Sequence, residues 1–321
     1  MPSQFHPDSL PNLTGRVYIV TGATSGIGFH TAARLAQHSA HVYICARTSE
    51  KGTLAIQKMA TLYPSHPLNI SILPMDHTNL STITNAAKTF LSRETQLHGL
   101  VNNAGVMATP FKMTCDGWEE QWQVNYLAHW VFTSLLVPVM LETSKREKGE
   151  EGSVRIVNLS SSGHYGAPTD GIHFADTSLE AESGMTRYGQ SKLANILHAK
   201  TLHKMYGPDS LTSSSNHGNI WVSTVHPGFV KSDIGINAQI PFYMRAAVHL
   251  ARWAGMEIDA DMGAWTSLHC VAGRGMKREE CGKYWQRVAD PEGWQSGLAG
   301  DEGMRERLEE WTVGEMGRWI G

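Results

Sequence analysis

The sequence predicts an α/β fold built on a doubly wound parallel β-sheet, and two observations lead to this prediction. Short β-rich segments alternate along the chain with longer segments whose apolar residues have helical spacing, which is typical of a parallel sheet covered by helices. Glycine and other small residues follow the first and the fourth β-rich segments, at the sheet edge where ligands of such folds bind. With 321 residues and 41% hydrophobic content, the chain can form one large domain.

We expect this single domain, residues 1–321, to have a core over about 15–285, a helical substrate lid over about 233–260 and a tail over 286–321. The lid is predicted from the apolar segment Ile234–Trp253. That segment could lie on a membrane surface, but a lid over a substrate pocket fits its position better. The segment Gly163–Arg187 is long for a connection in a compact domain, which predicts a functional loop near the cleft.

The first predicted strand, residues 17–20, leads directly into the glycine-rich segment TGATSGIG at 21–28, and a helix follows. This order is the one that a dinucleotide-phosphate loop requires, so the sheet is predicted to be of the Rossmann type. Gly22 would allow the tight turn, Gly26 would let the backbone approach a pyrophosphate, and Gly28 would let the helix pack on the strand. An ordinary glycine turn stays open as the alternative when this motif is taken alone.

The second predicted strand, His41–Ala46, ends next to a cation, Arg47. In a domain that binds NAD, an acidic residue here would hold the ribose 2′-hydroxyl, whereas a cation accommodates a 2′-phosphate. Arg47 therefore favours NADP(H) over NAD(H). Lys51 could add to this preference or could be only a solvated charge at the start of a helix.

The other elements follow from the same alternation. The fourth strand ends in NNAG at 102–105, and such small residues suit the close approach of a flat cofactor. The remaining strands are predicted at about 70–73, 100–101, 154–159, 220–225 and 282–285. The remaining helices are predicted at about 49–63, 80–97, 115–141, 188–205 and 261–271.

Tyr188 and Lys192 are four residues apart on one of these helices, so their side chains lie on one side of it, one turn apart. A free phenol has a pKa near ~10 and is a poor acid or base at neutral pH. A neighbouring ammonium group would lower that pKa toward the working range. The spacing alone is weak evidence, because such pairs are common on helix surfaces.

The composition argues against several other classes of protein. A net charge of −3 gives no electrostatic attraction to nucleic acid or to an anionic membrane. We find no apolar run near the ~18 residues of a membrane span and no signal peptide, so no transmembrane segment and a cytoplasmic location are expected. No metal is expected, because the four cysteines lack metal-ligand spacing and are interpreted as reduced thiols: Cys45, Cys115, Cys270 and Cys281.

Taken together, the motifs resemble the short-chain dehydrogenase/reductase family over roughly residues 15–285. Each motif is weak alone, but the ordered set is very specific. The long connection before Tyr188 and the SKLAN sequence after it resemble the retinol-dehydrogenase-like branch and its fungal relatives. The matching elements are TGATSGIG (21–28), NNAG (102–105), Asn125, the serine cluster at 160–162, YGQSK (188–192) and HPG (226–228).

The resemblance implies a catalytic role for four residues. Tyr188 would be the general acid in carbonyl reduction and the base in alcohol oxidation. Lys192 would lower its pKa and hold the nicotinamide ribose, and Asn125 would anchor a water that relays protons to Lys192. Ser161 would hydrogen-bond the substrate oxygen, with Ser160 as the competing candidate, because strand alternation points the two side chains to opposite faces.

The resemblance also implies which residues bind the cofactor, which we expect to be NADP(H) rather than NAD(H). Arg47 matches the NADP-selecting position and Asp76 the adenine contact. Ser232 stands where the family usually has threonine, so a hydroxyl is kept. The full expected set is Gly22, Ser25, Gly26, Ile27, Gly28, Arg47, Asp76, Asn102, Gly105, Tyr188, Lys192, Pro227, Gly228, Val230 and Ser232.

The expected function is therefore NADP(H)-dependent hydride transfer between nicotinamide and a carbonyl or alcohol group of a small molecule. The apolar lid and the resemblance suggest that this substrate is lipophilic. A catalytically silent NADP(H)-binding regulatory protein, or an epimerase or dehydratase on the same fold, are the alternatives. A homodimer that pairs the helix at 115–141 is one arrangement the family suggests, and a monomer stays open.

Overall fold

The computed structural model describes residues 5–64, 67–147, 150–214, 218–231, 238, 252–253, 255, 257–286 and 288–321. Ser232 and most of the predicted lid lie outside the described residues, so the lid and the role of Ser232 stay predictions.

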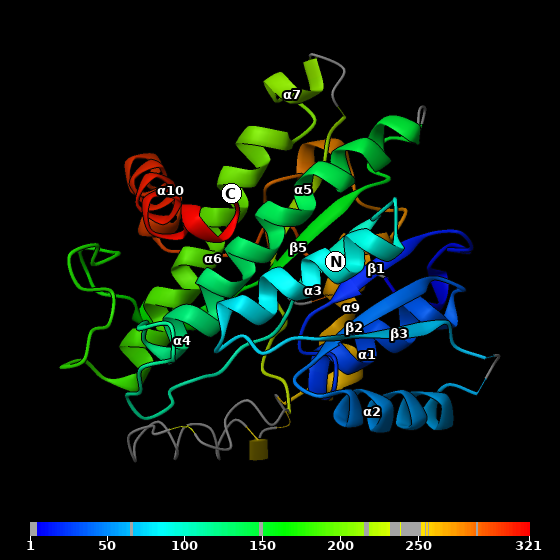
Figure 1. Cartoon of the computed structure of the whole chain (residues 1–321), viewed down its shortest axis with the longest axis horizontal. Coiled ribbons are helices and arrows are strands. Elements are labelled where there is room, and N and C mark those ends of the chain that lie inside the picture. The colour runs from blue at the N-terminus through cyan, green and yellow to red at the C-terminus, as the bar shows by residue number, and fades with distance from the viewer. Residues whose placement is uncertain are drawn as a thin grey trace.

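The described chain is organised around a seven-stranded sheet in the order β3-β2-β1-β4-β5-β6-β7, and every neighbouring pair of strands is parallel (Figure 1). The order reverses between β1 and β4, which is the switch point where open α/β sheets bind their ligands. This confirms the predicted fold class. The strands are β1 Val17–Val20, β2 His41–Ala46, β3 Ile70–Pro74, β4 Gly99–Asn102, β5 Arg155–Leu159, β6 Trp221–His226 and β7 Tyr284–Gln286.

Helices cover both faces of the sheet, as a parallel sheet requires, because its strands are buried on both sides. Helices α1, α2 and α9 pack into one apolar cluster with the sheet, and α3, α5 and α6 pack into another on the opposite face. The helices are α1 Gly26–Gln37, α2 Ser49–Leu62, α3 Leu80–Arg93, α4 Glu120–Trp122, α5 Ala128–Arg146, α6 Gly184–Tyr206, α7 Leu211–Ser214, α9 Ala260–Ala272 and α10 Glu302–Met316. The short irregular helices are η1 Pro7–Ser9, η2 Gln123–Leu127, η3 Ser162–Gly166, η5 Arg278–Glu280, η6 Gly297–Gly300 and η7 Gly317–Trp319.

The long apolar helix predicted over 115–141 begins later and is not uniform. The α-helix starts at Glu120, passes through the π-helical segment η2 and continues as α5 to Arg146. A π-helical turn inside an α-helix often marks a functional site, because it shifts the side chains that follow it. All five residues of η2 are buried, and Asn125 is the central one.

The expectation that no segment of the chain is apolar enough to cross a membrane was wrong for this helix. Among the described residues, Glu120–Arg146 is long and apolar enough to do so, with a mean hydropathy of 1.5 over its best window. In the structure, 72% of that window is buried inside the protein, as is typical of the core helix of a globular domain.

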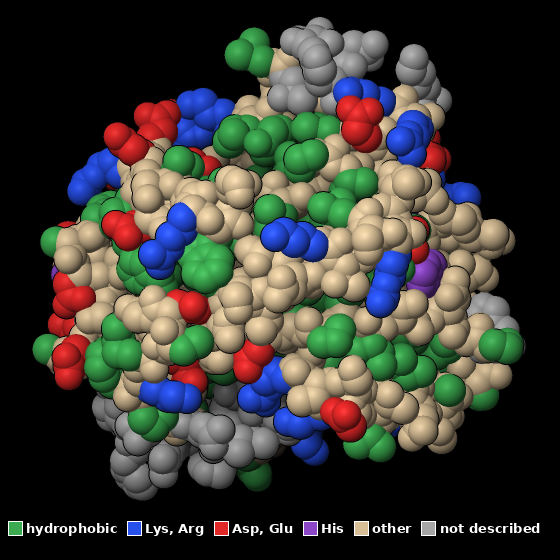
Figure 2. Space-filling view, in the orientation of Figure 1, with side chains coloured by type: hydrophobic (Ala, Val, Ile, Leu, Met, Phe, Trp, Pro, Cys, Tyr) green, Lys and Arg blue, Asp and Glu red, His purple; other side chains and the backbone are tan. Residues whose placement is uncertain are grey.

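The surface carries charges of both signs. On the face shown in Figure 2, basic side chains are interspersed with acidic ones.

The C-terminal tail contains a helix that the sequence analysis did not predict. Helix α10 packs along α6 (Figure 1) and contacts α5 through Glu309. Trp311 places its ring 5.6 Å from that of Trp118, and the Trp130 indole N–H donates to Glu309 at 3.1 Å. The helix at 115–141 that was proposed for a homodimer is therefore partly covered by the chain's own tail. Trp294, which lies between β7 and α10, is 81% exposed.

Candidate active site

The glycine-rich segment between β1 and α1 lies against the end of β4. Gly22 and Gly26 have φ angles of +62° and +57°, in the left-handed region that favours glycine. A Cβ atom on Gly22 would stand 2.8 Å from the Cα of Ala104, and one on Gly28 would stand 2.3 Å from the side-chain amide nitrogen of Asn103. Glycine is therefore required at 22 and 28 so that this loop can pack directly on the NNAG segment.

Two polar side chains fasten these segments together, and sequence reasoning did not single out either one. The Asn103 amide donates to the carbonyl oxygen of Thr21 at 2.8 Å. The Thr21 hydroxyl accepts from the main-chain N–H groups of Asn103 and Ala104 at 2.8 and 2.9 Å. The sequence does contain a threonine before the first glycine and a second asparagine in NNAG. Only the fold shows that these two residues are in contact.

The start of α1 suits an anionic group. The N-cap residue Ser25 is exposed and makes no capping hydrogen bond with its side chain, and no acidic residue stands in the first turn. The first N–H groups of a helix have no partner within the helix and carry the positive end of its dipole. Residues 26–28 therefore present N–H groups at the sheet's switch point, as a pyrophosphate site requires.

Arg47 and Asp76 follow adjacent strands, β2 and β3, at the same edge of the sheet. Arg47 is exposed and forms no ion pair within the described part of the chain, so its guanidinium group is available to an anion. Asp76 uses one carboxylate oxygen to accept from the main-chain N–H and the hydroxyl of Thr78, at 3.0 and 2.9 Å. Those two bonds fix the turn after β3 and leave the second oxygen of Asp76 for another donor.

Asn102, which was expected to help bind the cofactor, is buried at the end of β4. Its amide nitrogen donates to Thr133 at 2.9 Å and to Asn158 at 2.8 Å, inside the protein. The cofactor-binding role of Asn102 stays a prediction. Gly105 does lie at the site, because a Cβ there would stand 3.1 Å from Asn125 Oδ1 and 3.5 Å from Lys192 Nζ.

The loop after β6 approaches the glycine-rich segment from the other side. Gly228 has a φ of +93°, and Val230 forms a parallel bridge with Ile258. A Cβ on Gly263 of α9 would stand 2.8 Å from Val230 and 3.3 Å from Ile27, so both loops pack against one point of α9. Pro227 is half-buried beside them.

Four predicted catalytic residues come together at the carboxyl ends of β4 and β5. Tyr188 and Lys192 are only 4% and 3% exposed. Lys192 Nζ donates to the carbonyl oxygen of Leu159 at 3.0 Å and lies 5.7 Å from the centre of the Tyr188 ring. The Asn125 amide joins the group, because it donates to Ser191 Oγ at 2.9 Å and accepts from the Val106 N–H at 2.8 Å.

The electrostatics of Tyr188 differ from the sequence-based expectation. Burial raises the pKa of Tyr188 to about 12, and a hydrogen bond with Ser161 opposes that rise only in part. Burial also lowers the pKa of Lys192 to about 7. Both groups lose the water that stabilises their charged forms, and this loss is the largest cause of both pKa changes. The phenol is therefore protonated at neutral pH and ready to donate a proton.

The structure separates the two serines that competed for the substrate oxygen. The buried hydroxyl of Ser160 donates to the carbonyl oxygen of Lys192 at 2.8 Å, so it faces the backbone of α6. Ser161 Oγ lies on the other side, where it hydrogen-bonds Tyr188 and accepts from the Gly163 N–H at 3.0 Å. A Cβ on Gly163 would stand 2.6 Å from the Tyr188 ring, so glycine lets this turn close over the phenol.

We expect Ser161→Ala to lower kcat by about 10- to 100-fold, because it removes a charge-stabilising hydrogen bond of ~1.5–3 kcal/mol from the reacting oxygen. Ser160→Ala is the matched control and should keep most of its kcat, since Ser160 bonds only to a main-chain carbonyl. Steady-state kinetics on both variants measures the difference. A larger loss in Ser160→Ala would move the catalytic assignment by one residue.

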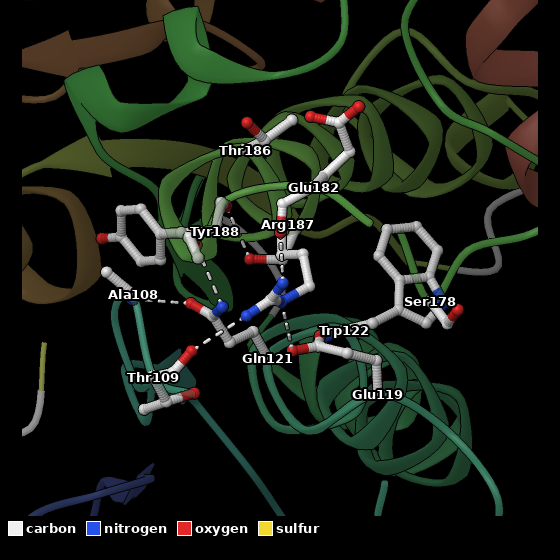
Figure 3. A network of polar contacts seen from close by, with 12 residues as sticks. Ala108, Thr109, Glu119, Gln121, Trp122, Ser178, Glu182, Thr186, Arg187 and Tyr188 are labelled. Carbon is white, nitrogen blue, oxygen red and sulfur yellow. Dashed lines mark hydrogen bonds and ion pairs between the residues drawn. The ribbon is translucent and has the colours of Figure 1, made fainter. Parts of the chain in front are cut away.

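A buried ion pair lies directly before Tyr188 (Figure 3). Arg187 Nε is 3.2 Å from Glu119 Oε1, and both side chains are buried. The guanidinium group of Arg187 also donates to the carbonyl oxygens of Glu182 at 2.6 Å and Thr109 at 3.1 Å. Burial raises the pKa of the Glu119 carboxyl group, and the positive charge of Arg187 opposes this rise.

Gln121, next to this ion pair, links the loop after NNAG to the start of α6. Its side chain accepts from the Ala108 N–H at 2.8 Å and donates to the Gly184 carbonyl at 3.0 Å. Figure 3 shows the Tyr188 ring leaving α6 on the side away from the guanidinium group of Arg187. Arg187 and Gln121 thus tie the loop after NNAG to the first turn of α6, which begins four residues before Tyr188 with Ser183 as its N-cap. The start of the predicted helix at Tyr188 was therefore one turn late.

Comparison with known proteins supplies the family. The model of the short chain dehydrogenase family matches residues 16–240, which include the glycine-rich segment, Asn125, Ser161, Tyr188 and Lys192. The chain belongs to the short-chain dehydrogenase family. It is therefore an oxidoreductase that acts on CH–OH or C=O groups. The recognition made from the ordered motifs is confirmed.

Two relatives illustrate this membership. The short-chain dehydrogenase/reductase drtF of Aspergillus calidoustus is 42% identical over 313 residues, which cover 97% of this chain and 96% of that protein. Human retinol dehydrogenase 11 is 35% identical over 271 residues, which cover 84% of this chain and 76% of that protein. The likeness to a retinol dehydrogenase agrees with the branch that the sequence resembles.

Solved structures show the same fold. An uncharacterised protein from Mycobacterium paratuberculosis matches with a TM-score of 0.71 at 24% identity, over 97% of each chain. The NADPH-bound carbonyl reductase from chicken fatty liver matches with a TM-score of 0.60 at 22% identity, over 88% of this chain and all of that one. Open α/β sheets bind their ligands outside the carboxyl ends of the strands, which is where the residues described above converge.

Proposed function

We propose that this short-chain dehydrogenase uses NADP(H) to interconvert a carbonyl and an alcohol on a lipophilic small molecule, with Tyr188 as the general acid and base. The observation that carries the proposal is the buried phenol of Tyr188, protonated at neutral pH, next to the hydroxyl of Ser161 at the ligand-binding edge of the sheet. A proton donor and a hydrogen-bond donor side by side are what a carbonyl oxygen needs when it becomes a hydroxyl.

The residues present fit a dinucleotide phosphate. The first turn of α1 offers N–H groups to the pyrophosphate, the glycines leave room for it, and Arg47 is a free cation at the end of β2 within the described chain. Among the described residues, Lys192 donates to one acceptor, the Leu159 carbonyl, whereas an ammonium group has three donors. Its remaining donors can hold ribose hydroxyls. When bound, the nicotinamide supplies or accepts the hydride.

In the reductive direction, Tyr188 gives its proton to the substrate oxygen while Ser161 keeps that oxygen in place. The resulting phenolate is buried, so it needs a nearby cation, and Lys192 is the one that the helix places one turn away. Asn125 fixes the loop after NNAG through Val106 and fixes α6 through Ser191, so it holds the two walls of the site at a constant separation. The expected water between Asn125 and Lys192 stays part of this proposal.

Two observations support a lipophilic substrate. The relatives include proteins named retinol dehydrogenase, whose substrate name denotes an apolar alcohol. Apolar side chains are also exposed near the described ends of the predicted lid, with Phe229 at one end and Trp253 at the other.

The cytoplasmic location of the protein stays a prediction from the sequence.

The decisive experiment follows NADPH absorbance with a panel of ketones and aldehydes of increasing chain length. We expect turnover that improves with chain length, because each buried methylene adds ~0.8 kcal/mol of binding energy. Calorimetric binding of NADPH without any turnover would favour the silent regulatory protein. Product formation without net loss of NADPH would favour an epimerase or dehydratase.

For cofactor choice, we expect Arg47→Asp to weaken NADPH binding by about 10- to 100-fold, which is the loss of a charge-assisted hydrogen bond of ~1.5–3 kcal/mol. Binding of NADH should stay the same or improve, because an acidic residue can hold a ribose hydroxyl. Lys88→Asp, at an exposed position of α3, changes the charge equally and is the matched control. Titration calorimetry with both cofactors measures the change, and equal dissociation constants in the unmodified enzyme would contradict the NADP(H) assignment.

A further inference from the structure

His164 joins the active-site serine to the C-terminal tail. It lies in η3, three residues after Ser161, and is only 1% exposed. Its Nδ1 atom is 2.7 Å from the carbonyl oxygen of Ser161, and its Nε2 atom is 3.0 Å from the main-chain nitrogen of Ser296. Ser296 lies in the tail, beyond residues 16–240 that the family model matches.

These two contacts fix the hydrogen positions on the ring. A main-chain N–H group can only donate and a carbonyl oxygen can only accept. Nε2 must therefore be the bare acceptor for Ser296, and Nδ1 must carry the hydrogen that it donates to Ser161. In a doubly protonated ring, Nε2 would also carry a hydrogen, and two N–H groups would then face each other without an acceptor. Burial lowers the pKa of His164, which agrees with a neutral ring.

The contact with Ser161 matters because of the turn that it holds. Ser161 is extended, with φ and ψ of −161° and 155°, and is the N-cap of η3. His164 holds its carbonyl oxygen while the Gly163 N–H holds its hydroxyl oxygen, so both ends of the residue are fixed. The hydroxyl of Ser161 is thereby directed at Tyr188.

We propose that His164, in the neutral form with hydrogen on Nδ1, is a positioning residue for Ser161, and that the tail segment around Ser296 sets the geometry of the active site through it. This inference rests on the proposed role of Ser161. It gives the tail a function in catalysis rather than only in covering α5 and α6.

The surroundings of the ring favour this one form. The groups that face it are the rings of Tyr165 at 4.3 Å and Tyr284 at 5.5 Å between centroids, together with His226 at the end of β6. The pKa of His226 is lowered to about 4, chiefly by burial, so it adds no positive charge at neutral pH. Among the described residues no carboxylate forms an ion pair with His164 that would hold a second proton there.

Four variants test the proposal in the full-length enzyme. His164→Phe keeps a planar ring and loses both bonds, whereas His164→Asn keeps an N–H donor near Ser161 and loses the acceptor. Ser296→Pro replaces the N–H with a ring carbon, and the φ of −66° at this residue suits proline. Ser296→Ala keeps the N–H and loses only the hydroxyl, so it is the matched control.

We expect kcat to fall about tenfold in His164→Phe and Ser296→Pro, by about threefold in His164→Asn, and very little in Ser296→Ala. Cofactor affinity, measured by calorimetry, should stay constant in all four, because none of these side chains lies at the dinucleotide edge. Full kcat in a folded His164→Phe variant, or equal losses in Ser296→Pro and Ser296→Ala, would overturn the inference.

A second measurement does not depend on activity. Nitrogen-15 spectra of histidine-labelled, cofactor-free enzyme report which ring nitrogen carries the hydrogen. We expect the Nδ1–H form for His164, and its loss in Ser296→Pro but not in Ser296→Ala. An Nε2–H form would overturn the inference. If the unmodified enzyme showed no turnover at all, the proposed function would fail while this spectrum still decided the ring contacts.

Discussion

Tyr188→Phe is expected to lower kcat by about 10²- to 10⁴-fold, the usual contribution of a positioned general acid. The substitution removes only the hydroxyl group, so the ring still fills its place against Gly163, where a Cβ would stand 2.6 Å away. Cofactor binding should change far less than turnover, because Tyr188 is only one of the expected cofactor contacts and the phosphate loop and Arg47 are untouched. The measurement pairs steady-state turnover with calorimetric titration of NADPH.

Tyr206→Phe, on the same helix, is the matched control for Tyr188→Phe and should retain its activity. Tyr206 stands at the far end of α6, away from Ser161 and Lys192. If Tyr188→Phe turned over like the unmodified enzyme, the phenol would not be the proton donor. The proposed mechanism would then have to use another group, although the fold and the family would stand.

Lys192→Met should make the folded protein more stable at neutral pH while it removes activity. Lowering the pKa of this lysine from 10.5 to about 7 costs the folded state ~5 kcal/mol below pH 7, at ~1.4 kcal/mol per pH unit. Lys192→Met also loses the hydrogen bond to the Leu159 carbonyl, which lowers the stability of the variant by ~1 kcal/mol. We therefore expect a gain of roughly 2–4 kcal/mol in the free energy of unfolding near pH 6–7.

The sign of this effect also predicts its pH dependence. Between pH about 7 and 10.5 the unfolded chain binds a proton at Lys192 that the folded protein does not bind, so the stability of the unmodified protein rises with pH there. The advantage of Lys192→Met should therefore shrink as the pH approaches ~10. Urea unfolding at several pH values measures it, and Lys204→Met, on the exposed face of α6, is the control. A constant difference across this range would contradict the lowered pKa.

Other features of the site agree with this cost at Lys192. Buried polar groups without full compensation are typical of functional sites, because catalysis needs groups that a stability-optimised core would avoid. Here the uncompensated groups are a lysine with one carbonyl partner and a phenol whose pKa is raised to about 12. The same burial that weakens the fold keeps Tyr188 protonated and therefore useful as an acid.

Much of the fold could be predicted because its signals are local. The strand at 17–20, the glycine turn after it and the helix that follows are adjacent in sequence, and the structure has them where they were expected. The tail was harder to predict. Helix α10 has weak apolar periodicity of its own and is stabilised by contacts with Trp118, Trp122 and Tyr126, which are nearly two hundred positions away in the chain.

The sequence by itself determined the family, the alternation of strands and helices in the core, and the residue types from which an acid, a cation and a phosphate loop can be built. The tertiary structure alone decided how those groups behave. Burial, which no local pattern records, raised the pKa of Tyr188 and lowered that of Lys192, and the packing of α6 on β5 set Ser160 and Ser161 to different tasks. Contacts between distant segments, such as that of His164 with Ser296, depend on where the whole chain places them in space.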